Sequence, residues 1–282
     1  MTMDDDLNQH RSRASLAGFG YPCPVSAPDD PPRRPPGFFA GFAAATVFFT
    51  RVPVATPGRG AWQIADVAWA FPLVGAGIGA VAALAFLLAQ LIGLGDWPAA
   101  LLSVLAGLAL TGALHEDGLA DTADGFFGGL DREEKLAIMR DSRHGTFGVL
   151  AILSSVLLRT AALVGLGDMI HAGLALVAAH AASRAILPSA MWALAPARAE
   201  GLGAAAGQPR PQGAIAAAVI GTLIALAALG PARGLIALGL TGVMVFAAAG
   251  LARRQIGGYT GDVLGAFQQI GEIVMLLAAS AR

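Results

Sequence analysis

Long apolar stretches alternate with short polar ones along most of this chain. Each apolar stretch is close to the roughly 20 residues that a helix needs to cross the hydrocarbon core of a bilayer. The pattern predicts an all-α, polytopic integral membrane protein, a helical bundle with about seven transmembrane helices. The predicted spans are, approximately, 67–93, 97–114, 146–166, 170–194, 213–229, 234–251 and 263–280.

Two N-terminal segments depart from this alternation. Residues 1–36 are polar and contain no apolar run, which predicts a disordered polar tail in front of one membrane-embedded domain, 37–282. The stretch Phe38–Thr50 is apolar but too short to span, and Arg51 ends it. We expect this stretch to form an interfacial or re-entrant helix.

The charges indicate how the predicted bundle is oriented. Only 13% of the residues are charged, about half the share that is typical of soluble domains. Of the 18 lysines and arginines, 14 fall with the N-terminal region and the loops 115–145, 195–212 and 252–262, and two fall on the other side. The positive-inside rule places these loops in the cytoplasm, so we expect an active site to face that side. The net charge of −1 argues against nucleic acid as a partner.

The segment His115-Glu-Asp-Gly-Leu-Ala-Asp-Thr-Ala-Asp-Gly125 concentrates acidic side chains directly after an apolar run. On a helix, Asp117, Asp121 and Asp124 fall within roughly 60° of arc, and three carboxylates on one face repel one another unless a cation lies between them. We predict that they bind Mg²⁺, whose usual substrates carry phosphate. The glycines of the segment are expected to interrupt the helix and to let the backbone approach a ligand. His115 is a candidate ligand or acid–base group.

A second polar segment runs from Asp131 to Gly148. Asp131 and Glu134 predict a capping box at the start of a helix, which Gly145 is placed to end. Arg140 and Arg143 flank Asp141 beside a glycine-rich entry into the next span, and arginine pairs well with phosphate oxygens. Asp141 is a candidate metal ligand or general base.

Two further constellations lie near and within predicted spans. The segment Gly257-Gly-Tyr-Thr-Gly-Asp262 precedes the last span, in which Glu272 is a carboxylate that needs a partner. Arg184 lies inside another apolar segment, and an intramembrane charge indicates function. We expect Arg184 to meet a substrate phosphate or one of the aspartates, whereas Arg159 is expected to pair structurally with another span.

These motifs, in order, resemble the cobalamin synthase family, the adenosylcobinamide-GDP ribazoletransferases. The resemblance rests on His115 to Gly125, on Ile138-Met-Arg-Asp-Ser-Arg-x-Gly-Thr-x-Gly148 and on Gly258-x-Thr-Gly-Asp-x-Leu-Gly-Ala266. It extends over about 38–281 and leaves out the polar tail. Glu116 stands where the family pattern leads us to expect an apolar residue, and it is not carried over as a site residue.

The resemblance implies a Mg²⁺-dependent, multi-pass enzyme of the cell inner membrane. Such an enzyme joins adenosylcobinamide-GDP to α-ribazole or α-ribazole 5′-phosphate and releases GMP. The expected partners are these substrates and the lipid bilayer, and assembly into a homo-oligomer is left open. The site residues expected on this basis are, for Mg²⁺, Asp117, Asp121 and Asp124; for catalysis, Asp141, His115, Arg140, Arg143 and Arg184; and for substrate binding, Thr146, Gly148, Gly258, Thr260, Gly261, Asp262 and Glu272.

Two other functions remain compatible with the residues. A CDP-alcohol phosphotransferase also uses spaced aspartates on membrane helices, but its pattern has no good match after Asp124. A transporter would explain charges at mid-depth such as Arg184 and Glu272, but the sequence has no internal repeat.

Overall fold

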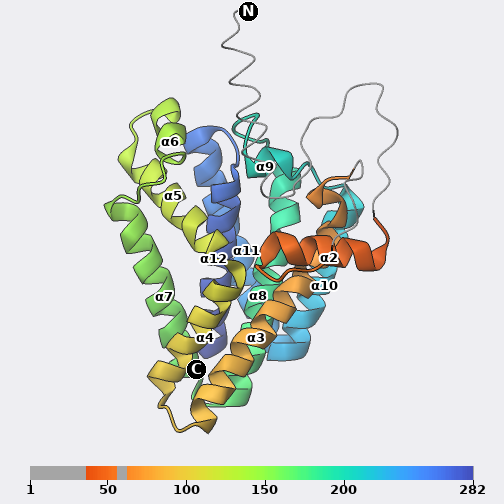
Figure 1. Ribbon diagram of the computed structural model, residues 1–282, viewed down its shortest axis with the longest axis vertical. Helices are drawn as coiled ribbons and strands as arrows, with labels where there is room; N and C mark the ends of the chain where they lie inside the picture. Colours follow the sequence, from red (N-terminus) through yellow and green to blue (C-terminus); the bar gives the residue numbers. More distant parts are fainter. Residues whose placement is uncertain (1–35, 56–61, 282) are drawn as a thin grey trace, which may run out of the picture.

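The computed structural model describes residues 36–55 and 62–281 and is helical over most of them (Figure 1). The predicted disordered tail, apart from its last residue, lies outside the described residues. The helices are α2 (Phe38–Phe49), η1 (Ile64–Ala70), α3 (Phe71–Leu91), α4 (Asp96–Thr111), α5 (Leu114–Gly128), α6 (Arg132–Ile138), α7 (Thr146–Leu166), α8 (Met169–Ala193), α9 (Leu202–Ala205), α10 (Pro211–Leu229), α11 (Pro231–Ile256) and α12 (Gly261–Ser280).

Six helical segments of the described chain are long and apolar enough to cross a membrane, with η1 and α3 counted as one. The pair α4 and α5 makes a seventh if the two helices form one broken span. The predicted all-α bundle of about seven spans is therefore confirmed. The predicted span 146–166 coincides with α7, whereas α11 extends beyond its predicted end to Ile256.

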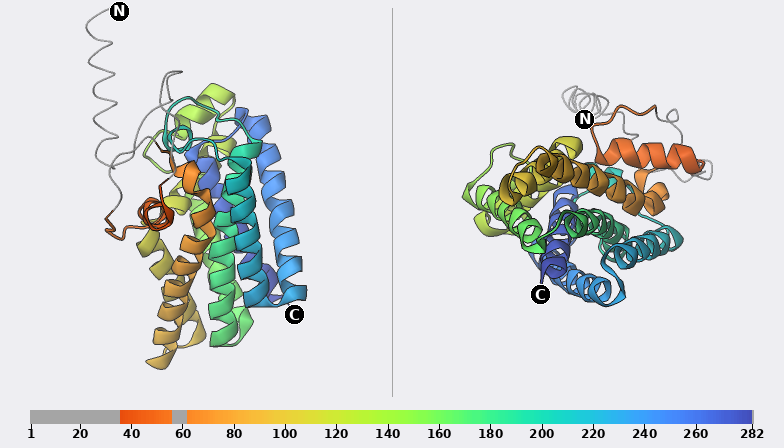
Figure 2. Two further views of the ribbon diagram at one scale, coloured as in Figure 1. Left: turned by 90° about the vertical axis from the view of Figure 1, so that its right-hand side faces the viewer. Right: turned by 90° about the horizontal axis from the view of Figure 1, so that it is seen from below.

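The long helix α8 lies near the centre of the bundle, with α3, α10 and α12 packed against it (Figure 2). Gly75 and Gly79, one turn apart on α3, face the backbone of α8. A Cβ atom on either glycine would collide with a carbonyl oxygen, that of His180 or Leu176. Small residues at such contacts let helices approach closely where lipid supplies no hydrophobic drive between them.

The helix α2 lies across the side of the bundle, roughly perpendicular to the long helices (Figures 1 and 2). Its buried residues include Ala44, Ala45 and Phe49, on the face that packs on η1 and α3. With 12 residues and this orientation, α2 does not run along the bundle as a span. Its location at a membrane interface stays a prediction.

The polar connections gather at one end of the bundle. The loops around α6, around α9 and between α11 and α12 lie together at the top of Figure 1. The connections after α3, α7 and α10 are short and lie at the opposite end. The loop regions 115–145, 195–212 and 252–262, which the positive charges assign to one side, therefore share one end of the described chain.

A sharp bend separates α4 from α5 and directs the acidic segment. The two helix axes differ by 91°. The bend occurs at Gly112 and Ala113, with φ of 65° and 57°, and Ala113 is the only non-glycine residue of the described chain with positive φ. Left-handed backbone is strained for residues other than glycine, so the surrounding packing must hold this bend in place.

Candidate active site

The acidic segment forms a continuous helix, α5, which confirms the helical spacing of its aspartates. Gly118 and Gly125 lie within the helix, so the prediction that they interrupt it is wrong. They serve helix contacts instead. A Cβ atom on Gly118 would lie 2.8 Å from the carbonyl oxygen of Asp262, and one on Gly125 would lie 3.0 Å from that of Lys135. The absence of side chains therefore brings α5 against α12 and α6.

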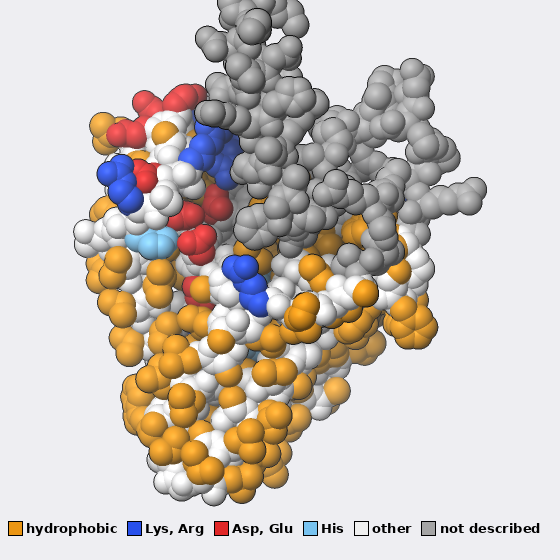
Figure 3. Space-filling model, viewed as in Figure 1, with side chains coloured by type: hydrophobic (Ala, Val, Ile, Leu, Met, Phe, Trp, Pro, Cys, Tyr) orange, Lys and Arg blue, Asp and Glu red, His pale blue; other side chains and the backbone are white. Residues whose placement is uncertain are grey.

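Asp117 and Asp121 converge with His144, which precedes α7. One ligand atom from each of these residues lies within 4.8 Å of the others. The His144 ring nitrogens are 3.7 Å from Asp117 Oδ1 and 3.8 Å from Asp121 Oδ1. Among the described residues, His144 is the only ion-pair partner of either aspartate, and neither arginine nor lysine offsets their charge. Figure 3 shows acidic side chains gathered with a histidine beside them above the apolar part of the surface.

Asp124 has a different role from the other two aspartates. Its Oδ2 accepts a hydrogen bond from Gly145 N at 2.7 Å, and its Oδ1 accepts one from Gly148 N at 2.8 Å. Asp124 thus binds the free backbone amides at the start of α7, and a Cβ atom on either glycine would collide with its carboxylate. The structure places His144, rather than Asp124, in the candidate metal group. Thr146, at the first residue of α7, is exposed.

The segment after α6 differs from its prediction. Asp131 does cap α6, since its side chain accepts from Glu134 N, but the helix ends at Ile138 rather than at Gly145. Beyond it, Asp141 accepts a backbone hydrogen bond from Arg143 and a forked pair from its guanidinium, the shortest at 2.6 Å. These bonds lower the pKa of Asp141 to about 2. Asp141 is therefore ionised at neutral pH and poorly matched to a general base there. Arg140 is exposed.

The turn before α12 places Asp262 beside the acidic helix. Thr260 caps α12, and its hydroxyl donates a hydrogen bond to Asp262 Oδ2 at 3.0 Å. The same oxygen lies 3.2 Å from a guanidinium nitrogen of Arg198, which comes from the loop before α9. Gly258 packs against the backbone of the loop after α8, and Gly261 packs against that of α9. Both glycines therefore serve close backbone packing that holds Asp262 in place.

A cavity of about 700 Å³, part of it open to solvent, lies between η1, α2, α3, α5, α8, α9 and α12. His115, Asp117 and Asp262 supply its polar wall. The His115 ring is stacked on Phe49, with ring centroids 5.7 Å apart. His115 and Asp262 thus line one cavity although their helices are far apart in the sequence. Asp117 lines the same cavity and also belongs to the Asp117–Asp121–His144 group.

A closed network of charged side chains lies deeper in the bundle. Arg159 on α7 bridges Glu116 at 3.0 Å and Glu272 at 2.9 Å, and all three side chains are at most 6% exposed. Glu116 is therefore a structural partner and not part of the candidate metal group, as the sequence indicated. The predicted structural pairing of Arg159 with another span is confirmed.

Arg184 and Glu272 belong to the same network. Arg184 Nη1 lies 3.1 Å from His180 Nδ1 and 3.9 Å from Glu272 Oε2, and its side chain is 1% exposed. Neither residue lines the cavity. The expectation that Arg184 meets one of the aspartates is wrong, because its partners are on α8 and α12. The charges that would have marked a transport pathway neutralise each other.

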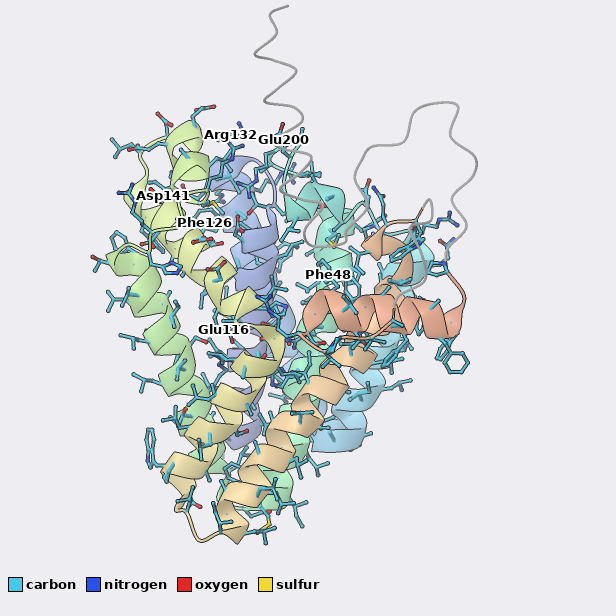
Figure 4. All side chains as sticks on the ribbon, viewed as in Figure 1. Phe48, Glu116, Phe126, Arg132, Asp141 and Glu200 are labelled. Carbon is cyan, nitrogen blue, oxygen red and sulfur yellow. The ribbon has the colours of Figure 1, made fainter. Side chains whose placement is uncertain are left out.

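Two residues of this region were not singled out from the sequence. His144 occupies an unspecified position of the second family motif, and Arg198 counts in the sequence only as one of the positive charges of the loop 195–212. Each becomes notable because the tertiary structure brings it to a carboxylate from another helix. Figure 4 shows the labelled Asp141 at the polar end and Glu116 deeper in the bundle.

Comparison with known proteins identifies the family. The family model described as cobalamin-5-phosphate synthase matches residues 41–280. An adenosylcobinamide-GDP ribazoletransferase of Bradyrhizobium diazoefficiens is 47% identical over 86% of this chain and 94% of its own length. The corresponding proteins of Mesorhizobium japonicum and Azorhizobium caulinodans are 47% and 46% identical, each over 84% of this chain and at least 92% of their own lengths. No solved structure matches the chain. The chain therefore belongs to the cobalamin-5-phosphate synthase family.

Proposed function

We propose that this protein joins adenosylcobinamide-GDP to α-ribazole, or to α-ribazole 5′-phosphate, and releases GMP. The family and the names of the relatives support this reaction. The observation that carries it in the structure is the pair Asp117 and Asp121, whose charges no arginine or lysine of the described chain offsets, at the edge of a cavity. Such a pair suits a cation that accompanies a diphosphate.

The donor atoms of this group fit a divalent cation. Two carboxylates and an imidazole within 4.8 Å of one another can share one ion, and hard cations such as Mg²⁺ prefer the carboxylate oxygens. Asp117 and Asp121 would hold Mg²⁺, with His144 next to it. Bound there, Mg²⁺ would offset the charge of the diphosphate and polarise its phosphoryl oxygens.

The chemical step is a displacement at phosphorus. A ribose hydroxyl oxygen of the ribazole forms a bond to the cobinamide-linked phosphorus, the bond from that phosphorus to the bridging oxygen breaks, and GMP leaves with that oxygen. The attacking group is not the 5′ oxygen, because that oxygen already carries the phosphate in α-ribazole 5′-phosphate. His115 lines the cavity and is the better placed acceptor for the hydroxyl proton, because Asp141 is held ionised by Arg143. Arg140 and Arg143, exposed at the polar end, would attract the anionic donor.

Arg184 acts from a greater depth. Its guanidinium carbon lies 5.7 Å from the centre of the Phe49 ring, and that ring is stacked on His115. Arg184 therefore contributes by holding this wall of the cavity. Glu272, its partner, is a positioning residue in this proposal and does not contact substrate.

The bundle would lie in the cell inner membrane with its polar end in the cytoplasm. The concentration of arginines in the loops at that end supports this orientation. The proposed site would then be accessible to cytosolic nucleotides and corrinoids. Labelling of single cysteines placed in the loop after α6 and in the loop after α7 would test it, because only the second should react from the periplasm.

The decisive experiment measures GMP release by purified protein in lipid, from adenosylcobinamide-GDP with α-ribazole, with and without Mg²⁺. Asp121→Asn should reduce turnover by at least 100-fold and raise the Mg²⁺ concentration needed for half-maximal rate. Asp168→Asn, an exposed residue at the opposite end of the bundle, is the matched control and should leave both quantities unchanged. Normal turnover and Mg²⁺ dependence in Asp121→Asn would overturn the metal assignment. CDP-diacylglycerol as donor should give no product.

A further inference from the structure

The cavity next to the candidate metal group has two chemically different walls. One wall is polar and consists of His115, Asp117 and Asp262. The rest is apolar and comes from seven elements; it includes Phe48, Phe49, Phe71, Leu187, Met191 and Leu264. A ligand that fits this cavity must therefore be apolar at one end and able to donate hydrogen bonds at the other, and hydroxyl groups meet the second condition.

The apolar wall is mainly aromatic. Phe49 meets Phe71 edge to face, with ring centroids 4.8 Å apart, and Phe48 meets Phe49 in the same way at 4.9 Å. Phe48 and Phe71 are nearly parallel, with centroids 6.4 Å apart. Phe49 and Phe71 are no more than 2% exposed, and Phe49 also contacts His115 and Arg184, so these rings can meet a ligand only where they border the cavity. Figure 4 shows the labelled Phe48 beside α2, on the side of the bundle where this wall lies.

The charges of the lining select between the two substrates. Among the described residues that line the cavity there is no lysine or arginine, and two are aspartates. Asp117 would also hold Mg²⁺, so a diphosphate has a partner at that edge of the cavity, whereas the apolar wall offers it none. The amide-rich corrin ring has little in common with an aromatic wall. A nucleoside with an apolar bicyclic base satisfies these conditions.

We infer that this cavity is the binding site of the acceptor nucleoside. The dimethylbenzimidazole base of α-ribazole packs against Phe48, Phe49 and Phe71, and the ribose hydroxyls face His115, Asp117 and Asp262. This places the attacking hydroxyl at the wall that borders the Asp117–Asp121–His144 group. The inference rests on the proposed function for the identity of the nucleoside, and it adds the residues that select its base.

The first test is equilibrium binding of α-ribazole, measured by calorimetry with protein in lipid nanodiscs and without the donor. Phe48→Ala should raise the Kd by at least tenfold, because it removes the aromatic face next to the base. Met191→Gln keeps the side-chain length but adds an amide to the apolar wall, and it should raise the Kd about fivefold or more. The controls are Phe39→Ala, an exposed residue on the same helix as Phe48, and Met169→Gln, at the far end of the same helix as Met191.

The second test is steady-state kinetics with both substrates. In Phe48→Ala and Met191→Gln, KM should rise for α-ribazole and stay within twofold for adenosylcobinamide-GDP. An analogue of α-ribazole with a purine base should bind the wild-type protein at least tenfold more weakly. If the donor KM rises instead, or if both variants bind α-ribazole with the wild-type Kd, the inference is overturned.

Two outcomes distinguish this inference from the proposed reaction and from a lipid-binding site. If wild-type protein binds α-ribazole through Phe48 and Met191 but releases no GMP, the cavity assignment stands and the proposed reaction fails. If mass spectrometry of the purified protein finds a phospholipid that α-ribazole does not displace, the apolar wall is a lipid site and the inference fails. Circular dichroism and thermal unfolding of each variant verify folding, and Met191→Gln preserves the test if Phe48→Ala does not fold.

Discussion

Replacement of Arg159 by methionine is expected to be among the most destabilising single changes in this protein. Arg159 lies between two carboxylates, 3.0 Å from Glu116 and 2.9 Å from Glu272, and all three side chains are buried. These contacts join α7 to α5 and to α12. Methionine preserves much of the apolar stem of arginine but removes the charge and its hydrogen bonds.

The magnitude follows from the charges that remain. The network contains two carboxylates, those of Glu116 and Glu272, and two guanidiniums, those of Arg159 and Arg184. Without Arg159, Glu116 has no ion-pair partner among the described residues, and Glu272 keeps His180 at 3.1 Å and Arg184 at 3.9 Å. Removal of one partner from a buried ion pair costs about 3–5 kcal/mol. The exposed pair Arg132–Glu133, at 3.7 Å, should contribute only about 0–1 kcal/mol.

The assay is reversible unfolding in mixed micelles, followed by circular dichroism, in a double-mutant cycle with Glu116→Gln. The double variant removes one charge of each sign and restores neutrality, so it should recover at least half of the loss seen in Arg159→Met. Arg254→Met, at an exposed arginine in the last turn of α11, is the control. If Arg159→Met loses no more stability than Arg254→Met, or if Glu116→Gln adds its own cost without recovery, the network does not stabilise the fold as argued.

Three further predictions address packing, capping and pH. Gly75→Ala should destabilise the protein by about 1–3 kcal/mol, because a Cβ atom there collides with the α8 backbone, whereas Gly77→Ala, with open space around it, should be neutral in the same thermal unfolding assay. Asp124→Ala should cost about 2–4 kcal/mol in chemical unfolding, because two backbone amides at the start of α7 lose their acceptor, and the concentration of Mg²⁺ at half-maximal activity should not change. Arg143 lowers the pKa of Asp141 from 3.8 to about 2, so their pairing stabilises the fold at neutral pH and is lost as the pH falls through about 2. The small difference in unfolding midpoint between wild type and Arg143→Gln should therefore shrink below about pH 4, and a constant difference would contradict this cause.

The sequence predicted the spans well because the length of an apolar stretch is a local property. The interval 146–166 coincides with α7, and the capping residue Asp131 begins α6 as its spacing indicated. The end of α6 was wrong by several residues, because Asp141 and Arg143 bind each other in a turn that helix propensity does not describe. The positions of these helices therefore follow from the local sequence pattern. The end of α6 is the exception, because hydrogen bonds between Asp141 and Arg143 favour a turn there.

The candidate site was predicted only in part. The helical spacing of Asp117 and Asp121 follows from residue numbers, and the structure brings them together as that spacing requires. Asp124 has the same periodicity, but its oxygens bind the amides of Gly145 and Gly148, which no spacing reveals. The bend at Gly112 is likewise a property of the packed chain, since glycine in the left-handed region is common and only its neighbours decide the angle.

The sequence alone was sufficient for the number and approximate limits of the spans, for the end of the bundle at which polar chemistry gathers, and for the family motifs. Each of these depends on composition or order along the chain. The tertiary structure decided which carboxylate meets which partner: His144 with Asp121, Arg198 with Asp262, and Arg159 with two glutamates. The physical reason is that most of these pairs join helices distant in the sequence, so their contacts depend on the angles at which the helices pack.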